Sequence, residues 1–342
     1  MPILSGSPAL PPLPTLLVVL VGPTAAGKSA VAAALAARRA VEVVVADSLQ
    51  VYRGLDVGTA KPTPAERARI PHHLVDILEP TEPFTAADFA TRARQAVAGI
   101  AARGRLPVVV GGTGLYVRAF LRGPLAGPGG DPGLRRRLLA EAEASGGAAL
   151  HARLAAVDPA AAAAIHPHNA VRVLRALELY TLSGTPPSAL RRGMEGAPPA
   201  GTVLLGLRRG RDDLARRIEA RTRGMIAGGL VEEVRGLLRR GIPRDAKPLG
   251  AIGYRQAVAH LDGRFSLAEA SRQIARDTRL YAKRQMTWFR REPGLAWMDL
   301  RPAAEAAEVA EAILARLECL GSRAAAGAEG GRPFHACAGG VR

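Results

Sequence analysis

Cysteine and long apolar runs are both scarce in this sequence of 342 residues. Only Cys319 and Cys337 occur, so neither a disulfide framework nor a cysteine-based metal site can form, which fits a reducing compartment. The apolar run at residues 16–21 is far shorter than the roughly 20 residues that a membrane-spanning helix needs. No basic segment precedes this run, and Gly22-Pro23 follows it. We therefore expect a cytoplasmic protein without a signal peptide or a membrane anchor.

Acidic residues are also under-represented. The chain has 30 Asp and Glu against 47 Lys and Arg, a formal net charge of +17. Such an excess favours a polyanionic partner, with nucleic acid first and an anionic membrane second. The length suits one large domain or two modest ones.

The chain contains four short, mainly apolar runs, at residues 16–21, 41–46, 106–110 and 202–207. They are rich in Val and Leu and lack polar alternation, which is typical of strands buried on both faces of a parallel sheet. An Ala-rich helical stretch at 28–39 follows the first run. This pattern predicts an α/β fold.

The remaining segments suggest a division into parts. Residues 121–200 have a helical pattern between Gly- and Pro-rich borders and predict an all-helical insertion. The core then comprises 15–120 and 201–320. The ends, 1–14 and 321–342, are rich in Pro or in Gly and Ala, and we expect them to be flexible or disordered.

The strongest local motif is a phosphate loop of the form G-x-x-x-x-G-K-[ST], placed between a strand and a helix as that motif requires. It consists of Gly22, Pro23, Thr24, Ala25, Ala26, Gly27, Lys28 and Ser29. Backbone N–H groups and the helix N-terminus hold a phosphate, Lys28 adds positive charge, and Ser29 can bind Mg²⁺. Kinases and NTPases with this loop normally present an Asp after a later strand. Here the run at 106–110 leads into Gly111-Gly112-Thr113, which weighs against nucleotide hydrolysis.

Ligands of open α/β sheets bind at the carboxyl ends of the strands. If the predicted strands are neighbours, Asp47 lies near the bound phosphate. This carboxylate could bind Mg²⁺ or accept a proton from a nucleophile. It could equally cap a helix or a turn, and spacing alone does not separate these roles.

An arginine interrupts an apolar helical stripe. Leu214, Ile218 and Met225 have spacings that place Arg221 on the same face. A core-facing Arg needs an anionic partner, which a diphosphate would supply. The alternative is an Arg whose head group reaches solvent.

Basic side chains form a second stripe further along the chain. Arg272, Arg276, Arg279 and Lys283 share one helix face, and Trp288 follows. We expect this stripe to lack acidic neighbours and to contact RNA, with base stacking on the aromatics, rather than to be merely solvated. The adjacent His72 and His73 point opposite ways on an extended chain, so they are poor joint metal ligands.

Several segments resemble the tRNA dimethylallyltransferase family. Its signature is matched by DSLQVYRGLDVGTAKP at 47–62. Further blocks occur in family order across roughly residues 16–298, namely PHHLVD at 71–76, GGTGLY at 111–116, HP at 166–167, RVLRALE at 172–178, GYRQ at 253–256 and KRQMTW at 283–288. His168-Asn169 replaces the Asn-Asp of many relatives.

The resemblance implies a P-loop NTPase-like parallel sheet flanked by helices, with a helical insertion that binds tRNA. It also implies a monomer that transfers a dimethylallyl group from dimethylallyl diphosphate, with Mg²⁺, to N6 of adenine 37 in the tRNA anticodon loop. The alternatives are a small-molecule kinase using ATP, a non-catalytic RNA-binding P-loop protein, and a transferase acting on free adenine nucleotide.

The resemblance also implies residue roles. Asp47 is the general base, while Thr24 and Arg221 stabilise the departing diphosphate, which Arg221 and the phosphate loop bind. The implied tRNA-binding residues are Asp47, Ser48, Leu49, Gln50, Thr113, Arg135, Val171, Arg172, Val173, Leu174, Arg175, Gly253, Tyr254, Arg255, Gln256, Arg276, Arg279, Lys283, Arg284, Gln285 and Trp288.

Overall fold

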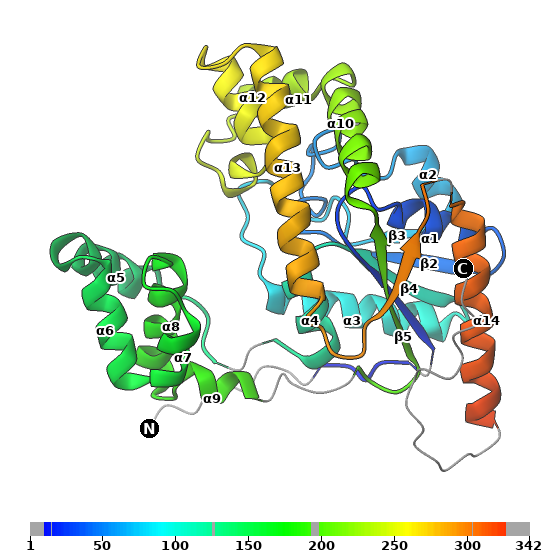
Figure 1. Ribbon diagram of the computed structural model, residues 1–342, viewed down its shortest axis with the longest axis horizontal. Helices are drawn as coiled ribbons and strands as arrows, with labels where there is room; N and C mark the ends of the chain where they lie inside the picture. The colour runs from blue at the N-terminus through cyan, green and yellow to red at the C-terminus, as the bar shows by residue number, and fades with distance from the viewer. Residues whose placement is uncertain (1–9, 15, 125–126, 193–197, 303, 326–342) are drawn as a thin grey trace. The chain divides into compact units, whose positions relative to one another are not determined.

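A computed structural model of the protein describes residues 10–14, 16–124, 127–192, 198–302 and 304–325 (Figure 1). The chain divides into two compact units. One comprises 1–121 and 197–342, and the other comprises 122–196. The first unit contains a six-stranded parallel sheet, and the second is built from helices.

The sheet has the strand order β3-β2-β4-β1-β5-β6. Its strands are β1 (Leu17–Val21), β2 (Val41–Ala46), β3 (His72–His73), β4 (Leu106–Gly111), β5 (Thr202–Arg209) and β6 (Ala296–Leu300). Every residue of β1, β2 and β4 is buried, as the Val- and Leu-rich runs predict, and this includes Glu42, the one charged residue in these three strands. The strand β4 separates β1 from β2, so the first two predicted strands are not direct neighbours.

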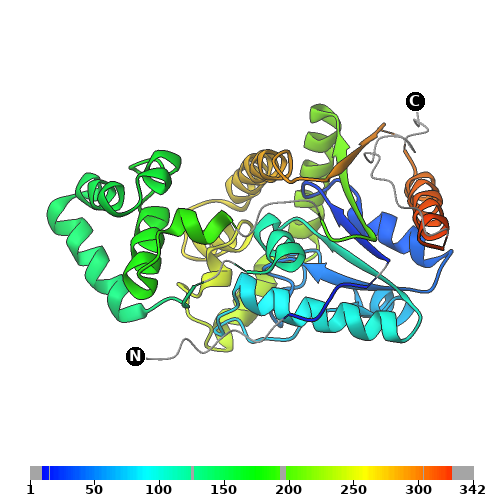
Figure 2. The same cartoon turned by 90° about the horizontal axis from the view of Figure 1, so that it is seen from below.

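Helices cover both faces of the sheet (Figure 2). Leu17, Val19 and Val21 of β1 face one cluster, whereas Val18 and Leu20 face the other, because side chains alternate along a strand. The second cluster includes α1 (Lys28–Ala36) and α14 (Ala306–Ala325), which lie side by side.

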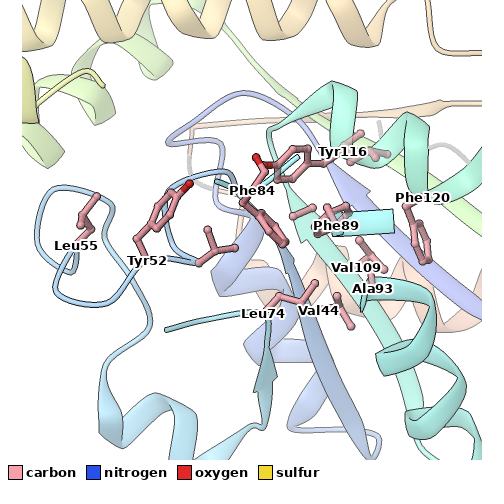
Figure 3. Close-up of a cluster of buried hydrophobic side chains, with 14 of the residues drawn as sticks. Val44, Tyr52, Leu55, Leu74, Phe84, Phe89, Ala93, Val109, Tyr116 and Phe120 are labelled. Carbon is pink, nitrogen blue, oxygen red and sulfur yellow. The ribbon is translucent and has the colours of Figure 1, made fainter. Parts of the chain in front are cut away.

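The first cluster is covered by the other long helices of this unit. These are α3 (Ala86–Ala102), α4 (Gly114–Arg122), α10 (Arg211–Ala227), α11 (Leu230–Arg239), α12 (Tyr254–Leu261) and α13 (Leu267–Phe289). The short η1 (Lys247–Gly250) adds Leu249 to the same cluster, and the remaining short helix of this unit is α2 (Pro64–Arg69). Figure 3 shows aromatic rings packed beside β2 and β4. Among them, Phe89 and Tyr116 stack with ring centroids 4.7 Å apart, which fixes α4 against α3.

The helical unit has its own apolar core. Its helices are α5 (Pro132–Ser145), α6 (Gly147–Val157), α7 (Pro159–Ala164), α8 (Ala170–Ser183) and α9 (Pro187–Arg192). Side-chain caps start three of them, because Asp131, Asp158 and Asn169 each accept a hydrogen bond from a first-turn backbone N–H. Leu138, Leu154 and Leu177 are among the buried residues.

The structure corrects some boundaries. The edge strand β6 is not among the four predicted strands, because its partly exposed residues lack the signature of a buried run. Helix α14 continues to Ala325, beyond the expected start of the C-terminal tail. In the N-terminal segment, Leu13 packs against the core. The rest of both predicted tails, 1–9 and 326–342, lies outside the described residues. None of the described helices is long and apolar enough to cross a membrane.

Candidate active site

The phosphate loop joins the end of β1 to α1. Gly22 has φ 140°, and a Cβ there would lie 2.6 Å from the carbonyl oxygen of Leu207, so only glycine fits. Ala25 and Gly27 also have positive φ, at 64° and 102°. Helix α1 begins directly after Gly27, which leaves first-turn N–H groups facing the loop. Such a helix start binds anions.

Lys28 lies within this loop. Its Nζ donates hydrogen bonds to the carbonyl oxygens of Gly22, at 2.9 Å, and Pro23, at 2.8 Å. Burial, together with the nearby charge of Arg221, lowers the pKa of Lys28 to about 7, although the charge of Asp47 opposes both effects. A bound anion would favour the charged form of Lys28.

Asp47 follows β2 directly. Its Oδ1 accepts hydrogen bonds from the backbone N–H groups of Leu49, at 2.8 Å, and Gln50, at 3.4 Å, which is a local turn. Asp47 also lines the same pocket as Lys28 and Arg221. Asp47 can therefore cap this turn with one carboxylate oxygen and still face a ligand in the pocket, so the two roles that the sequence left open do not exclude each other.

Arg221 projects from α10 into the pocket. Its Nη2 donates to the carbonyl oxygen of Thr59 at 3.0 Å, and Gln50 Nε2 donates to the same oxygen at 3.2 Å. Burial lowers the pKa of Arg221, and the charge of Asp47 opposes this shift. A carbonyl partner satisfies the guanidinium without neutralising it, so the cation can still attract an anion.

An ion cluster around the buried Lys61 shapes the loop that presents Thr59. Lys61 Nζ lies 2.6 Å from carboxylate oxygens of both Asp56 and Asp76. Glu233 accepts hydrogen bonds from three successive N–H groups at 56–58 and from the Tyr254 hydroxyl. Sequence reasoning missed Lys61 and Glu233. Only Lys61 carried a signal, because it belongs to the block at 47–62.

The loop after β4 forms another wall of the pocket. Gln285 of α13 bonds both to Gly112 and to the phosphate loop. Tyr281 also lines the pocket, although no sequence pattern singled it out. Burial and the charge of Asp47 raise the pKa of Tyr281 to about 12.

These parts enclose a pocket of about 520 Å³. Its polar walls come from the phosphate loop, the loops after β2 and β4, α10 and α13. They include Thr24, Lys28, Ser29, Asp47, Gln50, Gly112, Arg221, Tyr281 and Gln285. The two histidines separate as predicted, because His72 lines the pocket whereas His73 bonds to Glu42 at 2.7 Å. Among the described residues, no group of three His, Cys, Asp or Glu side chains could hold a metal ion.

Several residues with implied tRNA contacts are buried. In the helical unit, Val173 and Leu174 belong to the apolar core, while Val171 is 78% exposed. Tyr254 and Gln256 are 0% and 2% exposed in the other unit. Buried side chains cannot contact RNA in this structure, so the assignments to these four inward-facing residues need correction. They serve the packing of their own elements.

Tyr254 and the segment around it have a structural explanation. The Tyr254 ring fills the space above Gly58, where a Cβ would lie 2.5 Å from the ring. Gly253 adopts φ 94° and its N–H donates to Gln256 Oε1, which fixes the start of α12. Arg255 is exposed and pairs with Asp277 at 2.6 Å.

Two predicted tRNA-contacting arginines of the helical unit share one carboxylate. Glu178 Oε2 lies 2.8 Å from Arg135 and 2.7 Å from Arg175. Glu178 is itself buried, and it also accepts a hydrogen bond from the backbone N–H of Asp131. These arginines therefore neutralise a buried charge, whereas Arg172 on the same helix is exposed.

The basic stripe of α13 has acidic neighbours, so the expectation that it lacks them is wrong. Arg272 pairs with Glu269, Arg276 with Asp277 at 3.2 Å, and Arg279 with Glu219 of α10 at 2.9 Å. Lys283 and Arg284 are exposed.

Trp288 is less available for base stacking than predicted. The Arg118 guanidinium lies 4.6 Å from its ring centroid, and a Cβ at Gly114 would lie 2.2 Å from the ring. The indole therefore packs closely against α4, and Trp288 contributes to the junction of α13 with α4.

The parallel sheet, the phosphate loop and the buried cations together define a P-loop α/β protein with a site for a phosphorylated ligand. The family model of IPP transferase matches residues 50–292, and that of isopentenyl transferase matches 15–74. The chain belongs to the IPP transferase family, whose curated relatives are tRNA dimethylallyltransferases.

Relatives and solved structures agree with this assignment. A tRNA dimethylallyltransferase of Geobacter metallireducens is 54% identical over 286 residues, covering 83% of this chain and 93% of that protein. The crystal structure of a tRNA isopentenylpyrophosphate transferase from Bacillus halodurans is 41% identical, with a TM-score of 0.66, and covers 91% of this chain and 100% of its own. A eukaryotic dimethylallyltransferase acting on tRNA is 25% identical, with a TM-score of 0.73, and the match covers 93% and 80%.

Proposed function

We propose that this protein transfers a dimethylallyl group from dimethylallyl diphosphate to N6 of adenine 37 in the tRNA anticodon loop and releases diphosphate. The observation that carries the proposal is one pocket in which Asp47 and Arg221 converge on the phosphate loop. Membership of the IPP transferase family supplies the substrate class.

The donor binds through its diphosphate. N–H groups of the loop, Lys28 and Arg221 surround the place where a diphosphate fits. The Ser29 hydroxyl is at the start of α1, and with diphosphate oxygens and water it suits the oxygen-rich, partly hydrated coordination of Mg²⁺. When bound, Mg²⁺ would neutralise charge on the diphosphate.

The acceptor is an adenine extruded from its stack, because chemistry on a stacked base requires extrusion. The N6 lone pair attacks C1 of the dimethylallyl group, and the C1–O bond breaks with its electrons leaving on the diphosphate. The N6 proton passes to Asp47 as the C–N bond forms or afterwards. Thr24 and Arg221 stabilise the charge on the departing oxygen, while Gln50 contacts the base.

In each unit, considered by itself, exposed cations are available for contacts with tRNA phosphates, namely Lys283 and Arg284 on α13 and Arg172 in the helical unit. All the residues that we assign to the donor and to the acceptor base lie in one chain, which supports an active monomer. The tRNA substrate supports a cytoplasmic location.

The test is an assay of the purified protein with labelled dimethylallyl diphosphate and tRNA, AMP or no acceptor, beside ATP with small-molecule acceptors. We expect label to enter tRNA at adenine 37, and neither AMP modification nor phosphoryl transfer. Transfer to AMP alone would indicate a free-nucleotide transferase. Phosphoryl transfer from ATP without prenylation would indicate a kinase.

A further inference from the structure

A glutamine side chain joins the two loops that form the floor of the pocket. Gln285 Oε1 accepts a hydrogen bond from the Thr24 backbone N–H at 2.9 Å, and its Nε2 donates to the Gly112 carbonyl oxygen at 2.9 Å. These loops follow β1 and β4, which are adjacent strands. The amide thus connects α13 to the carboxyl edge of the sheet at its centre.

The fit of this amide is tight. Gln285 is only 6% exposed, and a Cβ at Gly112 would lie 2.2 Å from Gln285 Nε2. Both hydrogen-bond partners are backbone groups, whose positions the strands determine. Unsatisfied buried partners are costly, so the amide and the two peptide groups hold one another in a single arrangement.

A tyrosine lies next to this amide. Tyr281 lies one helical turn before Gln285 on α13, and both residues line the pocket together with Asp47. The Tyr281 phenol carries its proton at neutral pH and can donate a hydrogen bond to a bound ligand.

We propose that Gln285 is a positioning residue that fixes the peptide of Thr24 and thereby aims the phosphate loop at the diphosphate. The proposal rests on the proposed function for the identity of the donor. It replaces the direct tRNA contact implied by the family resemblance, because the two polar atoms of this buried amide already bind backbone groups. Misplacement of reacting groups by about 1 Å can cost about a hundredfold in rate.

The variant Gln285→Met tests this role, because Met has a similar length but cannot make either hydrogen bond. We expect the affinity for inorganic diphosphate to fall at least about tenfold and kcat for transfer to fall as well. The affinity for a labelled anticodon stem-loop should stay within about twofold. The Gln285→Glu variant keeps an acceptor for the Thr24 N–H, but it loses the donor to the Gly112 carbonyl oxygen and adds a negative charge to the pocket wall, so it should also bind diphosphate more weakly than wild type. Thr287→Ala, an exposed change on the same helix, is the matched control and should behave as wild type.

Two results would overturn the proposal. One is wild-type diphosphate affinity in Gln285→Met, and the other is weakened stem-loop binding with unchanged diphosphate binding. If Gln285→Met fails to fold, the comparison of Gln285→Glu with Thr287→Ala tests the proposal. Gln285→Glu must then lose diphosphate affinity relative to Thr287→Ala and still bind the stem-loop. If the wild type binds diphosphate but transfers no prenyl group, the proposed function fails while the diphosphate titrations still decide the role of Gln285. If the wild type binds no diphosphate, both fail.

Discussion

The cations of the pocket and those of α13 find their hydrogen-bond partners differently. Lys28 and Arg221 bond to backbone carbonyl oxygens in a buried site. Arg276 and Arg279 are exposed and pair with the carboxylates of Asp277 and Glu219. A carbonyl partner leaves the positive charge in place, whereas a carboxylate cancels it.

This difference in partners distinguishes the cations that can bind a ligand from those that only add charge to the surface. In the pocket, low dielectric strengthens the attraction of an uncancelled cation for a diphosphate. On α13, water and salt screen the charges, and exposed ion pairs are worth little. A count of basic residues therefore overstates the RNA-binding contribution of the stripe. The carboxylate of Asp47 also lies close to Lys28 and Arg221. Among the described contacts it forms no direct ion pair with either of them, so it does not cancel their charge as Asp277 and Glu219 do on α13.

The largest expected effect comes from Asp47→Asn. Asn keeps an oxygen that can accept the N–H of Leu49, so the turn should persist while the base is lost. We expect the transfer rate to fall by about 10²–10⁴-fold, with stem-loop affinity nearly unchanged. Single-turnover transfer with saturating donor measures the rate. The control is Glu219→Gln, which removes the carboxylate that pairs with Arg279 and should leave the transfer rate unchanged. Near-normal turnover in Asp47→Asn would show that this carboxylate, too, is only a counter-ion.

An intermediate effect should appear in the pH dependence of donor binding. The pKa of Lys28 is about 7 in the ligand-free protein, and a bound diphosphate raises it. Binding then takes up a proton above pH 7, so affinity should fall as pH rises, by up to about tenfold per pH unit until the pKa of the complex is reached.

Calorimetric titration of inorganic diphosphate in buffers with different ionisation enthalpies counts the protons taken up. Lys28→Met should bind more weakly and lack this proton uptake, and it also corrects for protons released by the ligand itself. Equal proton uptake in both proteins would contradict the role of Lys28.

The smallest effect concerns the stripe on α13. Each phosphate contact contributes a slope of about −0.7 to −0.9 to the dependence of log affinity on log salt. Lys283→Ala should lose about one contact, because no ion pair with Lys283 forms in the described part of the chain. Arg279→Ala should change the slope less, since Arg279 must first leave Glu219.

Stem-loop titrations at several salt concentrations give these slopes. The triple neutralisation of Arg276, Arg279 and Lys283 sets the upper limit. If even that variant matches wild type, the stripe is merely solvated and the RNA path runs over the helical unit near Arg172.

The sequence by itself determined the local chemistry of this protein. The glycines of the phosphate loop and the uninterrupted apolar runs act within a few residues, through backbone sterics and burial, so the loop and four strands could be predicted. The blocks in family order identified the family. Asp277 follows Arg276 directly in the chain, so the acidic partner of that arginine is also a local feature of the sequence.

Only the tertiary structure decided which groups meet. Arg279 pairs with a carboxylate 60 positions away, and Gln285 reaches a peptide group 261 positions away. No local pattern predicts such partners, because they depend on which helix packs against which strand. The same limit hid the role of Tyr281 and the ion pair of Arg135 with Glu178, whereas the pair of Arg175 with Glu178 is local, because the two residues lie three positions apart on one helix. Side-chain type and helical spacing determine the direction in which a charge points, but the packing of distant elements determines whether a carboxylate, a carbonyl or a ligand meets it there.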